Sequence, residues 1–336
     1  MRQSFLIGLI FILPTLFSSC NKSSSTDLVG NWVDRYDFDG IARSHAVGFT
    51  IGEKSYLVGG YDGDNRVRLN DAWQYDPSKN QWTSIATFPG IGRTNAIAFE
   101  ANGKGYVGLG YDGTNKLNDL WEYDPIADSW SQMTDFPESA RYGSVAFSVN
   151  GKGYVLGGYD GNYLKDVWEY DPIANSWAQK SSLPGSKRMN AVAFVIDNIA
   201  YVCTGVENAT YPEDFWAYDA STDTWTKKRD IANNSDDSYD DDYTSIVREN
   251  AVAFVINGLG YVATGDNSSV NATVWEYDPT TDLWKRKTDF EGAARLNAVG
   301  FTVSNRGFVV TGKTGSTYLD DIWELEPYST YNKNDK

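Results

Sequence analysis

Short stretches in which apolar and aromatic residues alternate with polar ones follow one another along most of the chain. Glycine, asparagine, aspartate and proline separate these stretches, which is the pattern typical of β-strands joined by tight turns. Three such stretches form a unit: an arginine followed by a run that ends in phenylalanine, a run that ends in glycine, and a Trp-x-[Tyr/Leu]-[Asp/Glu] segment. The first copies span residues 43–49, 56–60 and 73–76.

This unit recurs six times. Its arginines are 50, 48, 47, 60 and 47 residues apart and stand at Arg43, Arg93, Arg141, Arg188, Arg248 and Arg295. In five copies a second tryptophan follows the tyrosine of the Trp-x-Tyr segment by seven residues, as in Tyr75 to Trp82. Repeats of this length indicate solenoids, propellers or arrays. Turn signals such as Asn102-Gly103 and Pro77 divide each repeat into a four-stranded antiparallel meander.

Six such meanders predict an all-β fold, a six-bladed β-propeller. The sixth repeat lacks its last tryptophan, since Asn332 occupies that position. Trp32, however, precedes Arg43 by 11 residues, just as Trp284 precedes Arg295. We therefore expect the N-terminal segment to complete the last blade and close the ring, with the propeller spanning residues 30–328 and a tail at residues 329–336.

The repeat resembles the kelch motif over roughly residues 30–327. The resemblance rests on the Gly-Gly pairs at residues 59–60 and 157–158, on three Tyr-Asp-Gly triplets, and on the Tyr-x6-Trp spacing. It implies a kelch-type propeller but leaves the function open, because such propellers serve as enzymes and as binding scaffolds. The chemistry of galactose oxidase is excluded, because its copper site needs two histidines and a Cys-linked tyrosine, and this chain has one histidine. The six-bladed N-acetylneuraminate epimerases are kelch proteins closer in size.

The N-terminus predicts export. Residues 5–17 form an apolar segment that is too short to span a bilayer and fits the core of a signal peptide, here residues 1–19. Small residues before Cys20 resemble the lipobox of bacterial lipoproteins, and residues 20–29 read as a lipidated cysteine followed by a polar tether. We expect a lipoprotein held on a membrane of the bacterial cell envelope, most plausibly the outer membrane; ordinary signal cleavage is the alternative.

Charge and cysteine content limit the classes of partner that we expect for this chain. The chain carries 29 basic and 45 acidic residues, for a formal net charge of −16. Such a surface disfavours nucleic acid. Besides Cys20, the sole cysteine is Cys203, which lies in a predicted strand and is expected to be a buried apolar residue. We expect a monomeric domain with a protein or glycan ligand and without a bound cofactor.

Candidate ligand-contacting residues gather on one face of the predicted ring. Loops that connect neighbouring blades and loops that join the second and third strands should emerge together there. This face should carry the six arginines and, two residues after five of them, the polar residues His45, Asn95, Asn190, Asn250 and Asn297. One interpretation is a polar ring at the channel mouth. The favoured one is that the arginines lock the blades, because a residue repeated in every blade suits a structural role.

The repeats differ in two places. The first three keep Tyr-Asp-Gly after the second strand, and the last three do not. The loop from Trp225 to Arg248 spans 23 residues where its counterparts span 11, and its insertion carries Asp236, Asp237, Asp240, Asp241 and Asp242. Clustered carboxylates suit calcium, but the favoured interpretation is a disordered, solvated loop on the ligand face.

Two functions remain open. The favoured one is a binding module that uses the face bearing the 232–247 insertion. The alternative is a sugar mutarotase of the epimerase type, in which Glu249 would act as acid and base and the adjacent Arg248 would anchor a carboxylate. The presence of a pocket with opposed Glu and Arg at the channel mouth would distinguish them.

Overall fold

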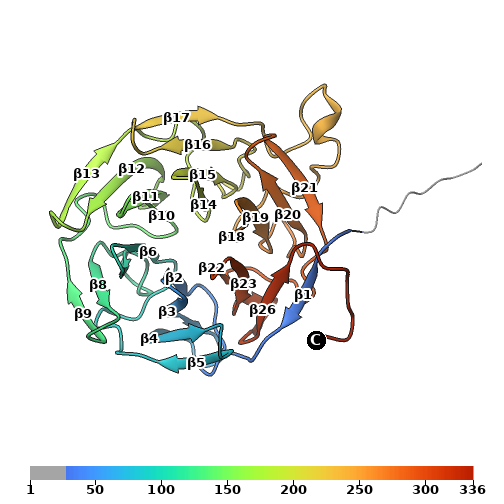
Figure 1. Ribbon diagram of the computed structural model, residues 1–336. Coiled ribbons are helices and arrows are strands. Elements are labelled where there is room, and N and C mark those ends of the chain that lie inside the picture. Colours follow the sequence, from blue (N-terminus) through green and yellow to red (C-terminus); the bar gives the residue numbers. More distant parts are fainter. Residues whose placement is uncertain (1–27, 336) are drawn as a thin grey trace, which may run out of the picture.

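The computed structural model describes residues 28–335 as six four-stranded antiparallel sheets arranged around a central channel (Figure 1). The predicted all-β, six-bladed propeller is thereby confirmed. The described residues contain one helix, the 3-10 helix η1 (Ser238–Asp240). In each blade the first strand lies nearest the channel and the fourth lies outermost.

Blades 1 to 3 are continuous in sequence and form ladders in the order of their strands. Blade 1 consists of β2 (Val47–Ile51), β3 (Lys54–Asp62), β4 (Val67–Asp76) and β5 (Gln81–Ser84). Blade 2 consists of β6 (Ile97–Ala101), β7 (Lys104–Gly108), β8 (Leu120–Asp124) and β9 (Ser129–Gln132). Blade 3 consists of β10 (Val145–Val149), β11 (Lys152–Tyr159), β12 (Tyr163–Asp171) and β13 (Ser176–Lys180).

Blades 4 and 5 repeat this order, and blade 6 combines the two ends of the chain. Blade 4 consists of β14 (Val192–Ile196), β15 (Ile199–Cys203), β16 (Trp216–Asp219) and β17 (Thr224–Lys227). Blade 5 consists of β18 (Val252–Ile256), β19 (Leu259–Ala263), β20 (Val274–Asp278) and β21 (Leu283–Lys287). Blade 6 consists of β22 (Val299–Val303), β23 (Arg306–Val310), β26 (Ile322–Glu326) and β1 (Asn31–Asp34), with a hairpin of β24 (Lys313–Thr314) and β25 (Thr317–Tyr318) after β23.

The ring closes through β1, as the sequence predicts. β1 pairs antiparallel with β26, with Trp32 opposite Leu325. Trp32 is fully buried and meets Phe290 edge-on at 4.8 Å between ring centroids. The C-terminal residues pack beside β1, where the Asn31 side chain donates to Asp335 at 2.7 Å. Because both chain ends join one sheet, blade 6 has four strands like the other blades, and the ring is closed by backbone hydrogen bonds.

A repeated polar contact joins neighbouring blades. In blade 2, Asp128 follows the tyrosine of the Trp-x-Tyr segment by five residues and accepts hydrogen bonds from the Tyr123 hydroxyl (2.9 Å) and the Ala86 backbone of blade 1 (2.8 Å). The Trp130 indole donates to the Ala86 carbonyl at 2.8 Å. Blades 3 and 4 repeat these contacts, which gives the Tyr-x6-Trp spacing a structural cause.

The predicted signal segment, Cys20 and most of the tether lie outside the described residues. β1, the first strand of the described part, lies at the outer rim of the ring (Figure 1). Within residues 28–335 no helix is long and apolar enough to cross a membrane. Cys203 is fully buried, as expected, and burial raises the pKa of its thiol to about 12.

Candidate functional site at the channel mouth

The six repeated arginines are buried inside the ring, where they stabilise the blades through hydrogen bonds and ion pairs. All six are buried, at no more than 2% exposure. In blade 2, for example, Arg93 donates to both oxygens of Asp119 at 2.6 and 2.7 Å and to the Leu109 carbonyl at 3.0 Å. Ion pairs of the same kind form in four other blades: Arg43–Asp71, Arg141–Asp166, Arg188–Asp214 and Arg295–Asp321. Of the two roles the sequence leaves open, the structure shows the structural one.

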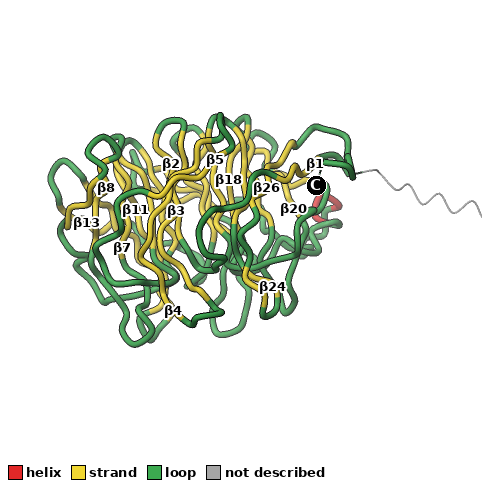
Figure 2. Tube along the Cα trace, turned by 90° about the horizontal axis from the view of Figure 1, so that it is seen from below, coloured by secondary structure: helices red, strands yellow, loops and turns green. Residues whose placement is uncertain are grey.

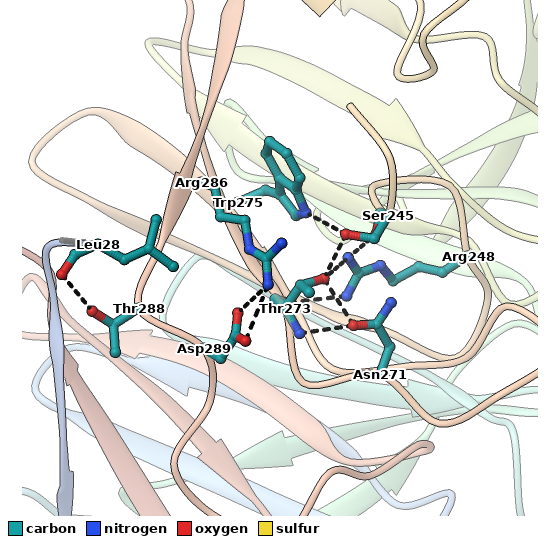
Figure 3. Close-up of polar contacts among 9 residues, drawn as sticks. All are labelled: Leu28, Ser245, Arg248, Asn271, Thr273, Trp275, Arg286, Thr288 and Asp289. Carbon is teal, nitrogen blue, oxygen red and sulfur yellow. Dashed lines mark hydrogen bonds and ion pairs between the residues drawn. The ribbon is translucent and has the colours of Figure 1, made fainter. Parts of the chain in front are cut away.

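Blade 5 departs from this rule, because Thr273 stands where the other blades have aspartate (Figure 3). Arg248 donates to the Thr273 hydroxyl at 2.6 Å and to the Thr264 carbonyl at 2.6 Å, and also to the carbonyl of Ser245. The Trp275 indole, whose counterparts bind aspartate, donates to the Ser245 hydroxyl at 3.3 Å. Burial without a carboxylate partner lowers the pKa of Arg248. Its side chain is enclosed and does not face Glu249, so the proposed Arg248–Glu249 pair does not form.

The residues two positions after the arginines form a closed belt around the channel. Each backbone N–H donates to the equivalent carbonyl of the preceding blade, at 2.8 to 3.3 Å, around the circle of His45, Asn95, Gly143, Asn190, Asn250 and Asn297. All six have a left-handed φ, between 51° and 66°. Glycine and asparagine adopt this conformation most readily, which explains their choice here. Their side chains line a central cavity of about 160 Å³.

The mouth is built from six residue pairs, one per blade. An isolated β-bridge joins the residue after each arginine to the residue that follows the second strand's glycine. The pairs are Ser44–Tyr61, Thr94–Tyr111, Tyr142–Tyr159, Met189–Val206, Glu249–Asp266 and Leu296–Lys313. These bridges confirm that the two sets of loops emerge on one face. Blades 1 to 3 therefore present tyrosine, blade 4 apolar groups, blade 5 two carboxylates and blade 6 a lysine.

Six tyrosines form a continuous line on this face, which we call the tyrosine arc: Tyr318, Tyr61, Tyr111, Tyr142, Tyr159 and Tyr163. Neighbouring rings contact one another at centroid distances of 5.1 to 5.9 Å, except between Tyr61 and Tyr111. There the Arg68 guanidinium lies over both rings, at 5.5 and 5.2 Å. Tyr318 comes from the β24–β25 hairpin, which Figure 2 shows at the lower face of the ring. None of the six rings is fully buried, so the arc is open to a ligand.

Three neighbouring hollows follow the arc. The first, about 310 Å³, is lined by residues of blades 6, 1, 2 and 3 that include Tyr61, Arg68, Lys313 and His45. The second shares Tyr111 and Tyr142 with the first and measures about 590 Å³. The third shares Tyr159 with the second and measures about 180 Å³.

His45 lies between the central cavity and the first hollow. Its Nδ1 is 2.7 Å from the Ser44 hydroxyl. Burial, together with the charges of Lys313 and Arg68, lowers the pKa of His45 to about 4. The imidazole is therefore neutral at pH 7, and its other ring nitrogen can donate or accept a hydrogen bond.

The acidic pair of blade 5 marks the other half of the mouth. Glu249 accepts a hydrogen bond from the Asn190 amide at 2.9 Å, and Asp266 accepts one from the Asn250 amide at 3.1 Å. Burial and the neighbouring Asp266 charge raise the pKa of Glu249. Glu249 thus remains at the mouth, as the mutarotase alternative requires, but its neighbour Arg248 does not.

The insertion before Arg248 is ordered, so the expectation of a disordered, solvated loop is wrong. Tyr243 and Ile246 are buried against blade 5, and the Tyr243 hydroxyl accepts a hydrogen bond from the Trp284 backbone at 2.7 Å. Figure 1 shows the segment with η1 at the outer rim beside β21, away from the channel. The insertion therefore stabilises blade 5 and does not cover the mouth.

The aspartates of the insertion do not gather into a metal site. Asp240 is buried and accepts hydrogen bonds from the Ser235 hydroxyl (3.0 Å) and from two backbone amides. The other four candidates, Asp236, Asp237, Asp241 and Asp242, are exposed. No group of three or more His, Cys, Asp or Glu side chains among residues 28–335 is arranged to hold a metal ion.

Sequence reasoning missed the side chains that make the arc. The Tyr-Asp-Gly triplets were visible, but they indicated turns and a family, and their rings were not treated as a surface. Arg68 and Lys313 carried no signal, because each occurs in one blade alone. The repeat itself offered a clue: the residue after each arginine varies while the arginine does not.

Comparisons with known proteins agree with this architecture. The family model described as the Attractin/LZTR1 β-propeller matches residues 105–319, more than half of the chain, and the kelch motif matches residues 42–89. The solved structure of YjhT superposes with a TM-score of 0.70 and 16% identity, over 85% of this chain and 95% of that one. At this identity the likeness concerns the fold. No curated protein matches the chain.

Proposed function

This chain belongs to the Attractin/LZTR1 β-propeller family, and on that premise we propose that it is an exported binding module that holds a glycan on its tyrosine arc. The observation that carries the proposal is the continuous line of six tyrosines along three hollows. Each ring offers a flat apolar face for the C–H groups of a sugar and a hydroxyl for its polar edge.

The shape of the mouth favours a glycan over a protein partner. A protein interface would use a broad surface with a desolvated centre. The arc instead follows a curved row of hollows whose walls are amphipathic rings. A protein ligand remains the alternative within the binding-module class.

Titration calorimetry of the purified protein with a panel of oligosaccharides tests the proposal. A bound oligosaccharide should lose about 30-fold in affinity on Tyr111→Ala, since a central interface tyrosine contributes about 2 kcal/mol. Tyr36→Ala is the matched control, because Tyr36 is 57% exposed and belongs to the segment after β1, outside the arc. Equal losses in the two variants, or no binding by any oligosaccharide, would contradict the proposal.

We also propose that the domain is anchored by acyl chains on Cys20, in the cell envelope and most plausibly on the outer membrane. The lipobox-like residues before Cys20 support this. Mass spectrometry of the mature N-terminus should find a diacylated or triacylated cysteine, and Cys20→Ser should release the protein from membranes. An unmodified N-terminus at another residue would exclude the anchor.

A sugar mutarotase is the second candidate function. It is favoured by Glu249, a carboxylate with a raised pKa at the channel mouth. A carboxylate at a channel mouth can exchange a proton with a bound sugar as a general acid or base. Exchange between sugar anomers, followed by NMR, should be accelerated by the wild type and not by Glu249→Gln. If the protein does not accelerate anomer exchange for any sugar that it binds, the mutarotase is excluded and the binding module is the function that stands.

A further inference from the structure

The cations of the arc have no carboxylate partners, in contrast to five of the six arginines inside the blades. The hollows are lined by Arg68, Lys313, Lys116 and Lys187, and none of these forms an ion pair with a carboxylate of residues 28–335. The chain has 45 acidic and 29 basic residues, so this gathering of unpaired cations stands against the negative net charge of the protein. Positive charge left unpaired in an acidic protein marks a place where an anion is expected.

The side chain of Arg68 is held in place by its neighbours. Its guanidinium lies between the rings of Tyr61 and Tyr111 and against Gly113, where a Cβ atom would be 2.3 Å from Nη1. Gly113 therefore has to be glycine for Arg68 to lie there. The Arg68 Nε is buried and has no hydrogen-bond partner. Asp112 is near enough for Arg68 to help lower its pKa, although backbone hydrogen bonds contribute more.

Cations alternate with tyrosines along the whole arc. Lys313 and Arg68 line the first hollow, Lys116 lines the second and lies 5.9 Å from the Tyr159 ring, and Lys187 lines the third. Two carboxylates, Asp160 and Glu207, line the second and third hollows. Positive charge is therefore least opposed in the first hollow, where Arg68, Lys313 and the neutral His45 converge.

We propose that the arc binds an acidic oligosaccharide, a chain with carboxylate-bearing sugars, whose rings stack on the tyrosines and whose carboxylates meet the alternating cations. The first hollow holds the principal carboxylate through Arg68 and Lys313. This inference rests on the proposed function and adds the charge and the extended form of the ligand. Planar guanidinium groups pair well with carboxylates.

Calorimetry with oligogalacturonate and with its fully methyl-esterified form tests this, because the two share a sugar chain and differ in charge. The acid should bind at least about 10-fold more tightly, and the difference should shrink as salt is raised. Arg68→Gln or Lys313→Gln should remove most of the difference. Arg66→Gln is the matched control: Arg66 lies just before β4, the strand that carries Arg68, is exposed and lines none of the three hollows. Monogalacturonate should bind more weakly than oligogalacturonate, because a single sugar can contact only part of the arc.

The outcomes separate this inference from the proposed function. Equal binding of acid and ester, lost with Tyr111→Ala, would keep the glycan-binding role and overturn the acidic ligand. Equal effects of Arg68→Gln and Arg66→Gln would overturn the role of Arg68. Poly-glutamate that binds as tightly as oligogalacturonate would show that charge alone is recognised. No binding of either sugar would overturn both proposals.

Discussion

Blades 2 and 5 stand on opposite sides of the ring and share one backbone plan, yet they differ at each variable position. Blade 2 has a carboxylate beneath its arginine, Asp119, and presents Thr94 and Tyr111 at the mouth. Blade 5 has Thr273 beneath its arginine and presents Glu249 and Asp266. The comparison shows that the repeat specifies the frame, whereas two positions in each blade, the one after the arginine and the one after the second strand's glycine, specify what the mouth can bind.

The same comparison explains the role of Ser245. Without an aspartate at position 273, blade 5 lacks the acceptor that holds both the arginine and the tryptophan in the other blades. Ser245 precedes Arg248 by three residues, as Gly90 precedes Arg93, and accepts from both Arg248 and Trp275. This serine therefore takes over part of the role of the missing carboxylate.

The largest expected difference between the two blades concerns stability. Asp119→Ala leaves Arg93 buried without its carboxylate and should cost about 3–5 kcal/mol of unfolding free energy. Thr273→Ala removes the hydroxyl that accepts from Arg248 and Ser245 and donates to Asn271, but it removes no carboxylate, and it should cost about 2 kcal/mol. Urea unfolding of both variants measures the difference. Equal losses of unfolding free energy in the two variants would mean that the carboxylate stabilises the buried arginine no more than the threonine does.

The next effect concerns pH and the belt below the mouth. Blades 2 and 5 carry asparagine there, whereas blade 1 carries His45, whose pKa falls from 6.5 to about 4 on folding. Between these values the unfolded chain binds a proton that the folded chain does not, so stability should fall as pH decreases from 6.5 to 4. The loss due to His45 is at most about 3 kcal/mol, and less where the channel admits water.

His45→Asn is the matched variant, since asparagine already occupies this left-handed position in blades 2, 4, 5 and 6. Melting curves between pH 7 and pH 4 should show a smaller acid-dependent loss in the variant than in the wild type. Parallel curves for the two proteins would mean that His45 is not held neutral by the fold.

The smallest effect concerns binding by the two halves of the mouth. Tyr142 contacts Tyr111 and Tyr159 in the middle of the arc. Tyr142→Ala should weaken oligosaccharide binding about 10-fold, a loss of about 1.4 kcal/mol. Glu249→Gln, in the acidic half, should change the affinity less than about two-fold. If Glu249→Gln weakens binding more than Tyr142→Ala does, the oligosaccharide binds at blade 5, and the mutarotase is favoured.

The fold was predictable from the sequence because it is periodic. The Asn-Gly turns occur in three repeats and the tryptophan spacing in five, each reflects local geometry, and Trp32 stands where a sixth copy of that tryptophan is expected. The tyrosine arc was not predictable in the same way. Its rings come from four blades, and the position of Arg68 depends on a glycine that follows it by 45 residues. Contacts of this kind, between residues of different blades, leave no recognisable pattern in the neighbouring sequence.

The insertion was misjudged for a related reason. Its five aspartates indicate a solvated segment, but Tyr243 and Ile246 follow them directly and are buried in the ring. Two apolar residues in an acidic loop are a weak signal without a known partner surface. The partner here is the outer edge of blade 5, which only the assembled ring presents.

A crystal structure of the protein with a bound oligogalacturonate would test the central claim most directly. The account predicts sugar rings stacked along Tyr61, Tyr111, Tyr142 and Tyr159, with a carboxylate beside Arg68. A sugar bound against Glu249 and Asp266, or on the opposite face of the ring, would contradict it.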